Sequence, residues 1–249
     1  MDNYFKEKVV LITGGASGIG KATCLKFSEQ GSKVVIVDMN EVSGKELEKQ
    51  ISDKGGEAVF VSCDLTIEEE IKSAIEVAIK RFNRLDFAYN NAGYGGKSGN
   101  IENYPVDDWD KVMNINLKAV FLCMKYEIPH ILKQGGAIVN CASVLSEVVN
   151  EDDSAYVASK FGVLGLTKNA ALEYAKKGIR INEVSPGFTR TPMIEYAGET
   201  KLDAIAARHP IGRLAKPEEI AEAVLWLCSE KASYLIGTNL MVDGGYTLI

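Results

Sequence analysis

The segment KVVLITGGASGIGKATCLKF, residues 8–27, joins a short apolar run to a glycine-rich turn and then to a helical pattern. The turn contains Gly14, Gly18 and Gly20. Glycine lets the backbone turn tightly and approach a ligand closely, and the start of a helix offers free N–H groups and a positive dipole end. The segment therefore predicts a strand, a turn suited to an anion such as a pyrophosphate, and a helix.

Other interpretations of this turn remain open. The glycine spacing is GxxxGxG, which matches the general dinucleotide-binding pattern GxGxxG only in part. Residues 15–21, GASGIGK, match the start of a P-loop, but Ala22 stands where that loop needs a serine or threonine for Mg²⁺. The remaining interpretation is a glycine-rich turn without a ligand.

Short apolar runs alternate with longer amphipathic stretches along the chain. The runs that predict strands are 8–13, 33–38, 58–63, 85–90, 136–141, 179–185 and 239–243. The stretches that predict helices are 18–30, 41–54, 67–82, 107–133, 155–177 and 217–229. Near-continuous apolar strands indicate burial on both faces, and the alternation indicates right-handed crossovers. We therefore expect an α/β fold over residues 1–249. It is a single domain with a doubly wound (Rossmann) parallel sheet of about seven strands and helices on both faces. Ligands should bind beyond the carboxyl ends of the strands.

Composition and charge exclude several classes of protein. Hydrophobic residues make up 46% and charged residues 25% of the 249 residues, as in an ordinary globular protein, and the net charge is −6. Without a basic stripe we expect no nucleic-acid partner, and without 18 consecutive apolar residues we expect no membrane span. The N-terminal apolar run is too short for a secretion signal, so we expect a cytoplasmic protein.

The cysteines and histidines suit neither a metal site nor a hydrolase. The five cysteines are scattered without a CxxC pair, at positions 24, 63, 123, 141 and 228. We interpret them as reduced thiols. The only histidines are His130 and His209. A zinc site needs clustered ligands, so we expect no metal, and the scarcity of histidine weakens a Ser-His-Asp hydrolase.

Asp38 bears on the choice of coenzyme. It ends the second apolar run, KVVIVD, 18 residues after Gly20, and no lysine or arginine follows until Lys45. A carboxylate at this point can accept hydrogen bonds from an adenosine ribose and would repel a 2′-phosphate. The pattern therefore favours NAD over NADP. The alternative is that Asp38 caps the helix that starts near Glu41.

Tyr156 and Lys160 are four residues apart and would share one face of a helix. A free tyrosine has a pKa of about 10, and a nearby cation lowers it by stabilising tyrosinate. Such a pair can act as a general acid and base near neutral pH. The alternative is an exposed surface pair without a role, because i, i+4 pairs are common.

Nine motifs together resemble the short-chain dehydrogenase/reductase family in its common form of about 250 residues. They are TGGASGIG (13–20), Asp38, CDL (63–65), NNAG (90–93), INL (115–117), Ser143, YVASK (156–160), SPGFTRT (185–191) and VDGG (242–245). The resemblance covers essentially the whole chain, and it implies the predicted fold.

The resemblance also implies roles for matching residues. Tyr156 would be the catalytic acid and base, and Lys160 would stabilise its tyrosinate and bind the nicotinamide ribose. Ser143 would hydrogen-bond the substrate oxygen. Asn116 would hold a water in a proton relay, a role for which Asn114 competes. The implied cofactor-binding residues are Gly14, Ser17, Gly18, Ile19, Gly20, Asp38, Asp64, Leu65, Asn91, Ala92, Gly93, Tyr156, Lys160, Pro186, Gly187, Thr189 and Thr191.

Within this set, Asp64 would contact adenine and Thr191 the carboxamide. Each residue also has a structural interpretation. Ser143 could cap or end a strand, Asn116 could be a polar residue inside a helix, and Asp64 could start a turn.

The implied activity is that of an NAD-dependent oxidoreductase. It would interconvert a small neutral secondary alcohol, cyclic or sugar-like, and its ketone. One alternative is an NADP-dependent 3-oxoacyl-type carbonyl reductase, and another is a catalytically silent dinucleotide-binding regulator. The resemblance further implies a homotetramer that associates through the helices expected at 107–133 and 155–177.

Three acids, Glu151, Asp152 and Asp153, come just before the helix expected at 155–177. They suit the helix dipole, and an Asp or Ser154 could cap the free N–H groups. We also hypothesise that these acids form a rim that disfavours anionic substrates. The segments 94–105 and 194–210 are expected to cover the substrate, the second as a mobile lid.

Overall fold

Within the residues that the computed structural model describes, 3–195 and 198–249, seven strands form one parallel sheet. The strands are β1 (Val9–Thr13), β2 (Lys33–Asp38), β3 (Glu57–Ser62), β4 (Phe87–Asn90), β5 (Gly136–Cys141), β6 (Ile179–Pro186) and β7 (Asn239–Val242). Their order is β3-β2-β1-β4-β5-β6-β7. The chain thus runs outward from β1 to β3, crosses back, and runs from β4 to β7. The predicted doubly wound sheet is confirmed, and its switch point lies between β1 and β4.

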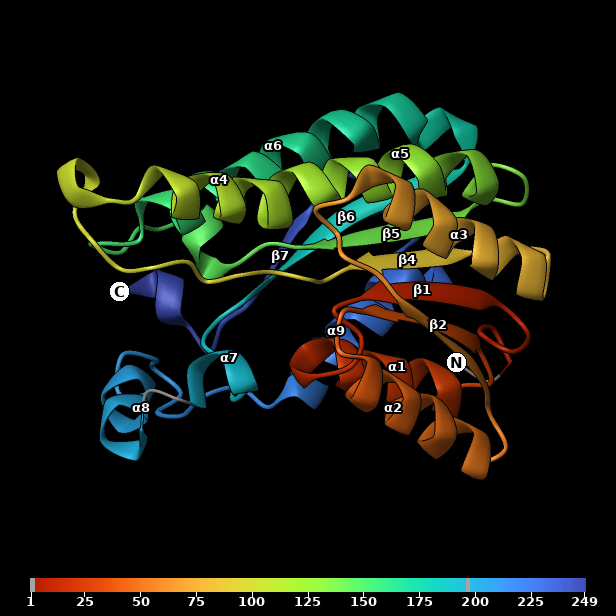
Figure 1. Ribbon diagram of the computed structural model, residues 1–249, viewed down its shortest axis with the longest axis horizontal. Coiled ribbons are helices and arrows are strands. Elements are labelled where there is room, and N and C mark those ends of the chain that lie inside the picture. The colour runs from red at the N-terminus through yellow and green to blue at the C-terminus, as the bar shows by residue number, and fades with distance from the viewer. Residues whose placement is uncertain (1–2, 196–197) are drawn as a thin grey trace.

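Helices cover both faces of this sheet. The α-helices are α1 (Gly18–Glu29), α2 (Glu41–Asp53), α3 (Glu68–Phe82), α4 (Val106–Met113), α5 (Ala119–Ile131), α6 (Ser154–Tyr174), α7 (Pro192–Glu195), α8 (Glu199–Ala206) and α9 (Pro217–Cys228). Short 3₁₀ turns are η1 (Ile101–Asn103), η3 (Val144–Ser146), η4 (Ala175–Lys177), η5 (Glu230–Ala232) and η6 (Tyr246–Leu248), and η2 (Asn114–Lys118) is a π turn. In Figure 1, α3 to α6 lie on one side of the sheet, and α1, α2 and α9 lie on the other.

The core consists of two apolar layers, one on each face of the sheet. On one face Leu11 belongs to a buried cluster with Ile71 of α3 and Val163 of α6. On the other face its neighbour Ile12 belongs to a buried cluster with Phe27 of α1. Successive side chains of a strand point to opposite faces, so an unbroken apolar run is what a doubly covered strand requires.

One predicted helix differs from the structure. The pattern at 107–133 predicts a continuous helix, but the π turn η2 separates α4 from α5. This turn contains Asn116, whose side chain is fully buried and bonded to neighbouring segments. A π turn widens one helical turn by a residue, and such turns occur often at functional sites.

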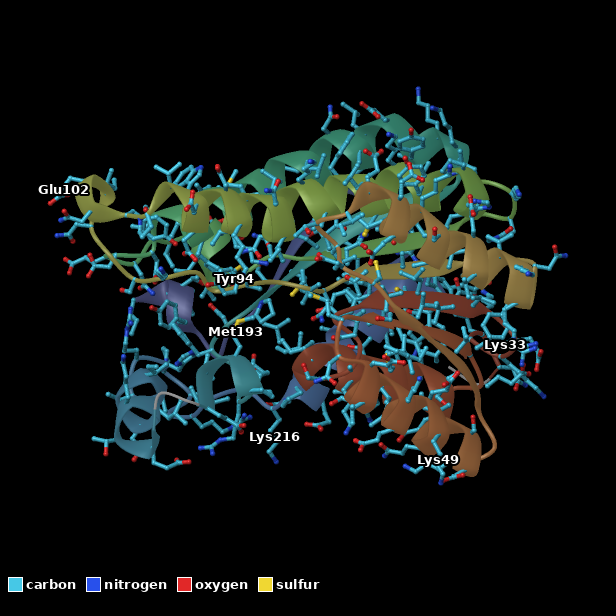
Figure 2. The ribbon with its side chains drawn as sticks, viewed as in Figure 1. Lys33, Lys49, Tyr94, Glu102, Met193 and Lys216 are labelled. Carbon is cyan, nitrogen blue, oxygen red and sulfur yellow. The ribbon has the colours of Figure 1, made fainter. Side chains whose placement is uncertain are left out.

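Two short helices that follow β6, α7 and α8, form a lobe beyond the carboxyl ends of the strands. In Figure 1, α7 and α8 lie apart from both helical layers, below α4 and the chain after β4. In Figure 2, Tyr94 and Met193 mark this end of the molecule, whereas Lys33 and Lys49 mark the opposite end. In the described part of the chain, no helix is both long and apolar enough to cross a membrane.

Candidate active site

The glycine turn after β1 is tightly built. Gly18 has a φ of +50°, and a Cβ at Gly20 would lie 2.0 Å from the carbonyl oxygen of Gly14. A side chain therefore cannot be placed at Gly20. Helix α1 follows directly, and the side chain of its N-cap, Ser17, makes no capping hydrogen bond. The first N–H groups of α1 have no partner within the helix, so this helix start fits the pyrophosphate of a dinucleotide.

The NNAG segment is bonded to the end of β1. The Asn91 side chain donates from Nδ2 to the carbonyl oxygens of Thr13 and Gly14, at 3.0 and 3.2 Å. The backbone N–H groups of Asn91 and Ala92 donate to the Thr13 hydroxyl at 3.0 and 3.2 Å. These bonds join β4 to β1 at the switch point. The predicted residues of the turn and of NNAG therefore lie together.

Asp38 lies beside this turn at the carboxyl end of β2. Its carboxylate accepts from the backbone N–H of Ala16 at 3.0 Å and from that of Asn40 at 2.9 Å. The N-cap of α2 is Asn40, whose side chain accepts from the N–H of Ser43 at 3.0 Å. The alternative that Asp38 caps this helix is therefore wrong.

Asp64 and Leu65 follow the next strand, β3. The Asp64 carboxylate accepts from the backbone N–H and the hydroxyl of Thr66, each at 2.8 Å. The turn-forming role considered for Asp64 is therefore present. Leu65 is buried in the core layer beneath it. A contact of Asp64 with adenine stays a prediction.

The segment after β6 closes over the glycine turn. Pro186 ends β6, and the backbone N–H of Gly187 donates to Val242 at 3.0 Å. The Thr189 hydroxyl donates back to Gly187 at 3.0 Å. A Cβ at Gly18 would lie 3.1 Å from the Thr191 Cγ2 atom, so the two segments are in contact.

Lys160 carries its charge into the interior. Only 3% of this residue is exposed, and its Nζ donates to the carbonyl oxygen of Cys141 at 2.8 Å, at the end of β5. The same Nζ lies 5.5 Å from the centre of the Tyr156 ring. Tyr156 itself is half-buried and packs against the apolar cluster of Val144, Leu145 and Tyr246. The alternative of an exposed surface pair is therefore wrong for Lys160.

Asn116 connects the chain after β4 to α6. Its Oδ1 accepts from the backbone N–H of Tyr94 at 2.7 Å, and its Nδ2 donates to the Tyr94 carbonyl at 3.0 Å and to the Ser159 hydroxyl at 3.1 Å. Ser159 in turn donates to the carbonyl oxygen of Tyr156 at 2.7 Å. The side chain of Asn116 thus holds two segments of the site in place. A relay water at Asn116 stays a prediction.

Ser143 lies two residues after Cys141 and is 8% exposed. It is the N-cap of η3, and its hydroxyl oxygen accepts from the N–H of Leu145 at 3.1 Å. The capping role considered for Ser143 is therefore present. Because capping uses a lone pair of the hydroxyl oxygen, its hydrogen can still be donated to a substrate. The four predicted catalytic residues thus gather where β4 and β5 end.

Comparison with known proteins agrees with this geometry. A family model described as enoyl-(acyl carrier protein) reductase, of the short-chain dehydrogenase/reductase type, matches residues 14–247. The chain belongs to the short-chain dehydrogenase/reductase family. It is 45% identical over 248 residues to a cyclohexanol dehydrogenase of Acinetobacter sp. (strain SE19), covering 99% of this chain and 98% of the relative.

Two further relatives cover the chain equally well. A cis-4-hydroxycyclohexanecarboxylate dehydrogenase of Sinomonas cyclohexanicum is 40% identical over 250 residues, which is 100% of both chains. The crystal structure of levodione reductase superposes with a TM-score of 0.95 and 34% identity, covering 98% of this chain and 99% of that one. The fold and the oxidoreductase class of the family therefore apply to this chain.

In this member of the family the acidic segment before α6 is not bonded as its sequence suggested. Asp153 is the N-cap of α6, but its side chain makes no capping bond and instead accepts from the Asn150 side chain at 3.2 Å. Asp153 therefore does not supply the side-chain cap that an Asp at this helix start could provide. Glu151 and Asp152 line a pocket of about 540 Å³ together with Glu102. This pocket lies beside the start of α6, and none of the four catalytic candidates lines it.

The segments expected to cover the substrate differ in how they are fixed. Asp108 of α4, which is 7% exposed, accepts from the backbone N–H of Lys97 at 2.7 Å and from the hydroxyls of Tyr104 and Tyr94 at 2.8 and 3.0 Å. Burial raises the pKa of this carboxyl, but the three donors outweigh it and hold the pKa below its ordinary value. The second segment, 194–210, contains the end of α7 and all of α8, and its residues 196–197 lie outside the described residues.

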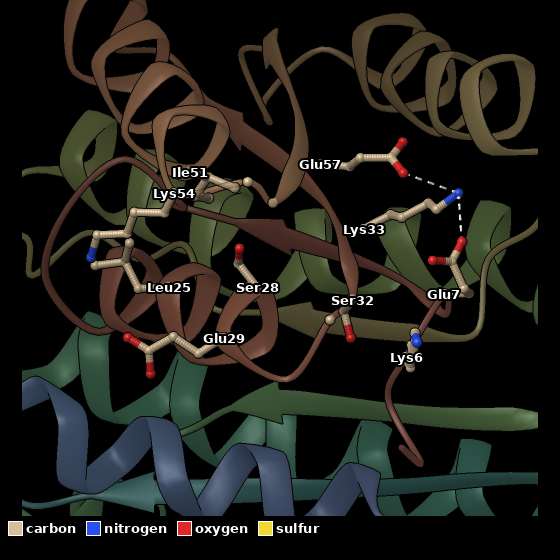
Figure 3. Close-up of a pocket in the computed structure, with 13 residues that line it drawn as sticks. Lys6, Glu7, Leu25, Ser28, Glu29, Ser32, Lys33, Ile51, Lys54 and Glu57 are labelled. Atoms are coloured by element: carbon tan, nitrogen blue, oxygen red, sulfur yellow. Dashed lines mark ion pairs between the residues drawn. The ribbon is translucent and has the colours of Figure 1, made fainter. Parts of the chain in front are cut away.

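A second cleft, of about 440 Å³, lies at the amino end of β2, away from the site (Figure 3). One of its cations, Lys33, is paired with Glu7 at 3.0 Å and with Glu57 at 3.4 Å. Ligands of doubly wound sheets bind at the opposite, carboxyl ends of the strands. The described residues include no group of three or more His, Cys, Asp or Glu side chains arranged to hold a metal.

Two buried acids behind the site were missed by the sequence interpretation. Glu127 of α5 and Glu183 of β6 are both fully buried. Burial raises the pKa of Glu127 to about 8, although a hydrogen bond from Asn90 lowers it slightly. The signal was present, because Glu183 interrupts the apolar strand IRINEVS.

Proposed function

We propose that this chain is an NAD-dependent alcohol dehydrogenase that interconverts a small, neutral, cyclic secondary alcohol and its ketone. The observation that supports it best is the buried Lys160 ammonium, held by Cys141 beside the Tyr156 ring. An amine is buried at such cost only where its charge is used or compensated. The names of two relatives, a cyclohexanol and a hydroxycyclohexanecarboxylate dehydrogenase, support a cyclic alcohol.

The catalytic roles follow from this arrangement. Tyr156, as tyrosinate, removes the proton from the alcohol oxygen, and in the reverse direction its hydroxyl returns a proton to the carbonyl oxygen. Lys160 stabilises the tyrosinate by its charge. The Ser143 hydroxyl donates to the same substrate oxygen and stabilises the charge that develops there. A bound nicotinamide supplies the hydride chemistry, because no side chain can accept or release hydride.

The residues that would hold the coenzyme are those around the switch point. The open start of α1 would take the pyrophosphate, Asp38 the adenosine ribose, and Asp64 with Leu65 the adenine. Asn91, Ala92 and Gly93 would line the nicotinamide side, together with Thr189 and Thr191. A Cβ at Gly93 would lie 3.6 Å from the Asn116 Oδ1 and 3.7 Å from the Lys160 Nζ, so backbone here faces the catalytic groups directly.

The charge near the adenosine position supports NAD over NADP. Asp38 has two backbone donors on its carboxylate, and no basic residue stands between it and Lys45. A 2′-phosphate at this point would face a carboxylate. The alternative, an NADP-dependent 3-oxoacyl-type carbonyl reductase, would need basic groups here and at the rim. A 3-oxoacyl-[acyl-carrier-protein] reductase of Thermotoga maritima, 39% identical over 242 residues, is the relative whose name favours this alternative.

The acidic rim, Glu151, Asp152 and Asp153, is the basis for proposing a neutral substrate, and it lies beside the catalytic candidates rather than among them. Glu102, Glu151 and Asp152 stand around one pocket beside α6. We expect the Asp152→Asn, Asp153→Asn double variant to oxidise 4-hydroxycyclohexanecarboxylate several-fold faster, with cyclohexanol oxidation nearly unchanged. Exposed charges have small effects, so the comparison needs kcat/KM for both alcohols at low salt. Equal kcat/KM for the carboxylate in both proteins would contradict a role for the rim.

The first experiment is a titration of the purified protein with NADH and with NADPH, followed by nicotinamide fluorescence. Tight NADH and weak NADPH are expected. The Tyr156→Phe variant should lose turnover of cyclohexanol by a factor of about 10² or more while keeping its NADH affinity. Preference for NADPH would favour the carbonyl reductase, and full activity of Tyr156→Phe would contradict the proposed mechanism.

A further inference from the structure

Glu183 lies in a row of polar side chains that crosses the sheet behind the site. The strand register aligns Asn90 of β4, Asn140 of β5, Glu183 of β6 and Asn239 of β7. Directly paired residues of parallel strands point to the same face, here the face covered by α5 and α6. Glu183 is fully buried in this row.

Hydrogen bonds connect the Asn90 and Asn140 side chains of this row, whereas, within the described part of the chain, acceptor atoms of Glu183 and Asn239 lack partners. The Asn90 Nδ2 donates to the Asn140 Oδ1 at 3.0 Å, and the Asn140 Nδ2 donates to the Thr167 hydroxyl at 2.9 Å. Among the described residues, neither carboxylate oxygen of Glu183 has a hydrogen-bond partner, and the Asn239 Oδ1 beside it has none either. A buried carboxyl that served only to hold the fold would be paired, so its presence calls for another explanation.

The charged groups around Glu183 include the catalytic lysine. Burial is the largest influence and raises the pKa of Glu183 to about 7. The Lys160 charge lowers this pKa most, and the Thr167 hydroxyl and the Lys168 charge lower it further. Glu147, from the chain after η3, raises it. The Lys160 Nζ is held by Cys141, which is the next residue after the Asn140 that pairs with Glu183.

We propose that Glu183 is a positioning residue of the active site, a buried carboxyl that sets the net charge beneath Tyr156 by acting on Lys160. The inference rests on the proposed function. When Glu183 is ionised, its charge offsets part of the positive potential of Lys160, and tyrosinate is less stabilised. When Glu183 is neutral, the full charge of Lys160 acts on Tyr156. Glu183 and Tyr156 are therefore expected to lose their protons over a wider pH range than either would alone.

The test is the pH dependence of kcat for alcohol oxidation at saturating coenzyme and alcohol, in wild type and Glu183→Gln. On the acid limb of this profile, kcat rises with pH. In wild type this rise should extend over a broader pH range than a single ionisation gives. In the variant it should move to lower pH by about half a unit to one unit and become as steep as a single ionisation. Tyrosinate absorbance without coenzyme, taken as the difference between each protein and its Tyr156→Phe counterpart, should show the same shift independently of turnover.

Two further variants separate positioning from folding. Glu127→Gln removes the other buried carboxyl of the same network and should leave the wild-type limb in place. Glu183→Asp keeps the carboxyl and should keep the broad limb. A Glu183→Gln limb that superposes on wild type, or a uniform loss of kcat with no shift, would overturn the proposal. A steep single limb in Glu183→Asp would overturn it equally, even if the glutamine variant fails to fold.

These outcomes are distinct from failure of the proposed function. If wild type oxidises no alcohol with either coenzyme, or if Tyr156→Phe remains active, the proposed function fails before Glu183 is tested. If wild type is active, Tyr156→Phe is inactive and the Glu183 variants keep the wild-type limb, only the inference about Glu183 fails.

Discussion

Single side chains in this protein are held by partners that fix how they can be used. Lys160 of α6 donates to the carbonyl oxygen of Cys141, the last residue of β5. Asp38 is fixed in the same way, since its two backbone donors come from the glycine turn and from the start of α2. Its charge therefore stands at a defined point beside the proposed adenosine site.

The Asp38→Asn variant tests whether this carboxylate selects between the two coenzymes. Removing the charge ends the repulsion of a 2′-phosphate and weakens acceptance from ribose hydroxyls. We expect the ratio of NADPH to NADH affinity to rise by about tenfold or more, equivalent to at least roughly 1.4 kcal/mol. Fluorescence titration measures both affinities. Asp53→Asn, at the exposed far end of α2, is the matched control and should change neither.

Elements were easier to predict than the contacts between them. The bounds of β2 and β5 match the apolar runs residue for residue, because buried parallel strands need unbroken apolar sequence. The break at η2 was not predictable from periodicity, since a single widened turn leaves the apolar face of both flanking helices intact. The sequence also could not predict that Asn40 rather than Asp38 caps α2, because both side chains can accept a hydrogen bond from a backbone N–H.

The loop from Tyr94 to Tyr104 is held by the side chain of Asp108. Asp108 accepts three hydrogen bonds from it, and Asp108→Asn replaces one carboxylate oxygen by a donor. The lost bond should loosen the loop and raise the KM for the alcohol by about three- to tenfold, in line with roughly 1 kcal/mol per hydrogen bond. Hydrogen exchange at Lys97 should quicken.

The neighbouring Asp107→Asn is the control for this loop, since Asp107 is exposed on the same first turn of α4. It should change neither KM nor exchange. Unchanged exchange at Lys97 in Asp108→Asn would show that the loop is held by other contacts.

The expected homotetramer can be tested at two exposed aromatic side chains. Phe121 of α5 and Phe161 of α6 are 48% and 42% exposed, and they lie in the two regions through which the family resemblance implies that a homotetramer associates. Replacing both by Ser should shift the protein toward smaller species, which light scattering coupled to size exclusion would detect. Val42→Ser, at an apolar site on α2 that is even more exposed, at 70%, should leave the assembly unchanged. Wild type that elutes as a monomer would refute the proposed tetramer.

The pH dependence of folding stability tests whether buried Glu127 is protonated in the folded protein. Glu127 holds its proton to a pKa of about 8 in the folded protein, but an unfolded glutamate loses it near 4.5. Between these values only the unfolded chain releases the proton, so rising pH favours unfolding. The free energy of unfolding of wild type, relative to Glu127→Gln, should therefore fall from about pH 4.5 to pH 8. The slope should be at most about 1.4 kcal/mol per pH unit.

Urea unfolding at several pH values measures this difference in the free energy of unfolding. The contribution of Glu183 cancels because both proteins contain it. A difference that does not change with pH would mean that Glu127 is ionised in the folded protein, and its unpartnered Oε1 would then need a donor other than Asn90.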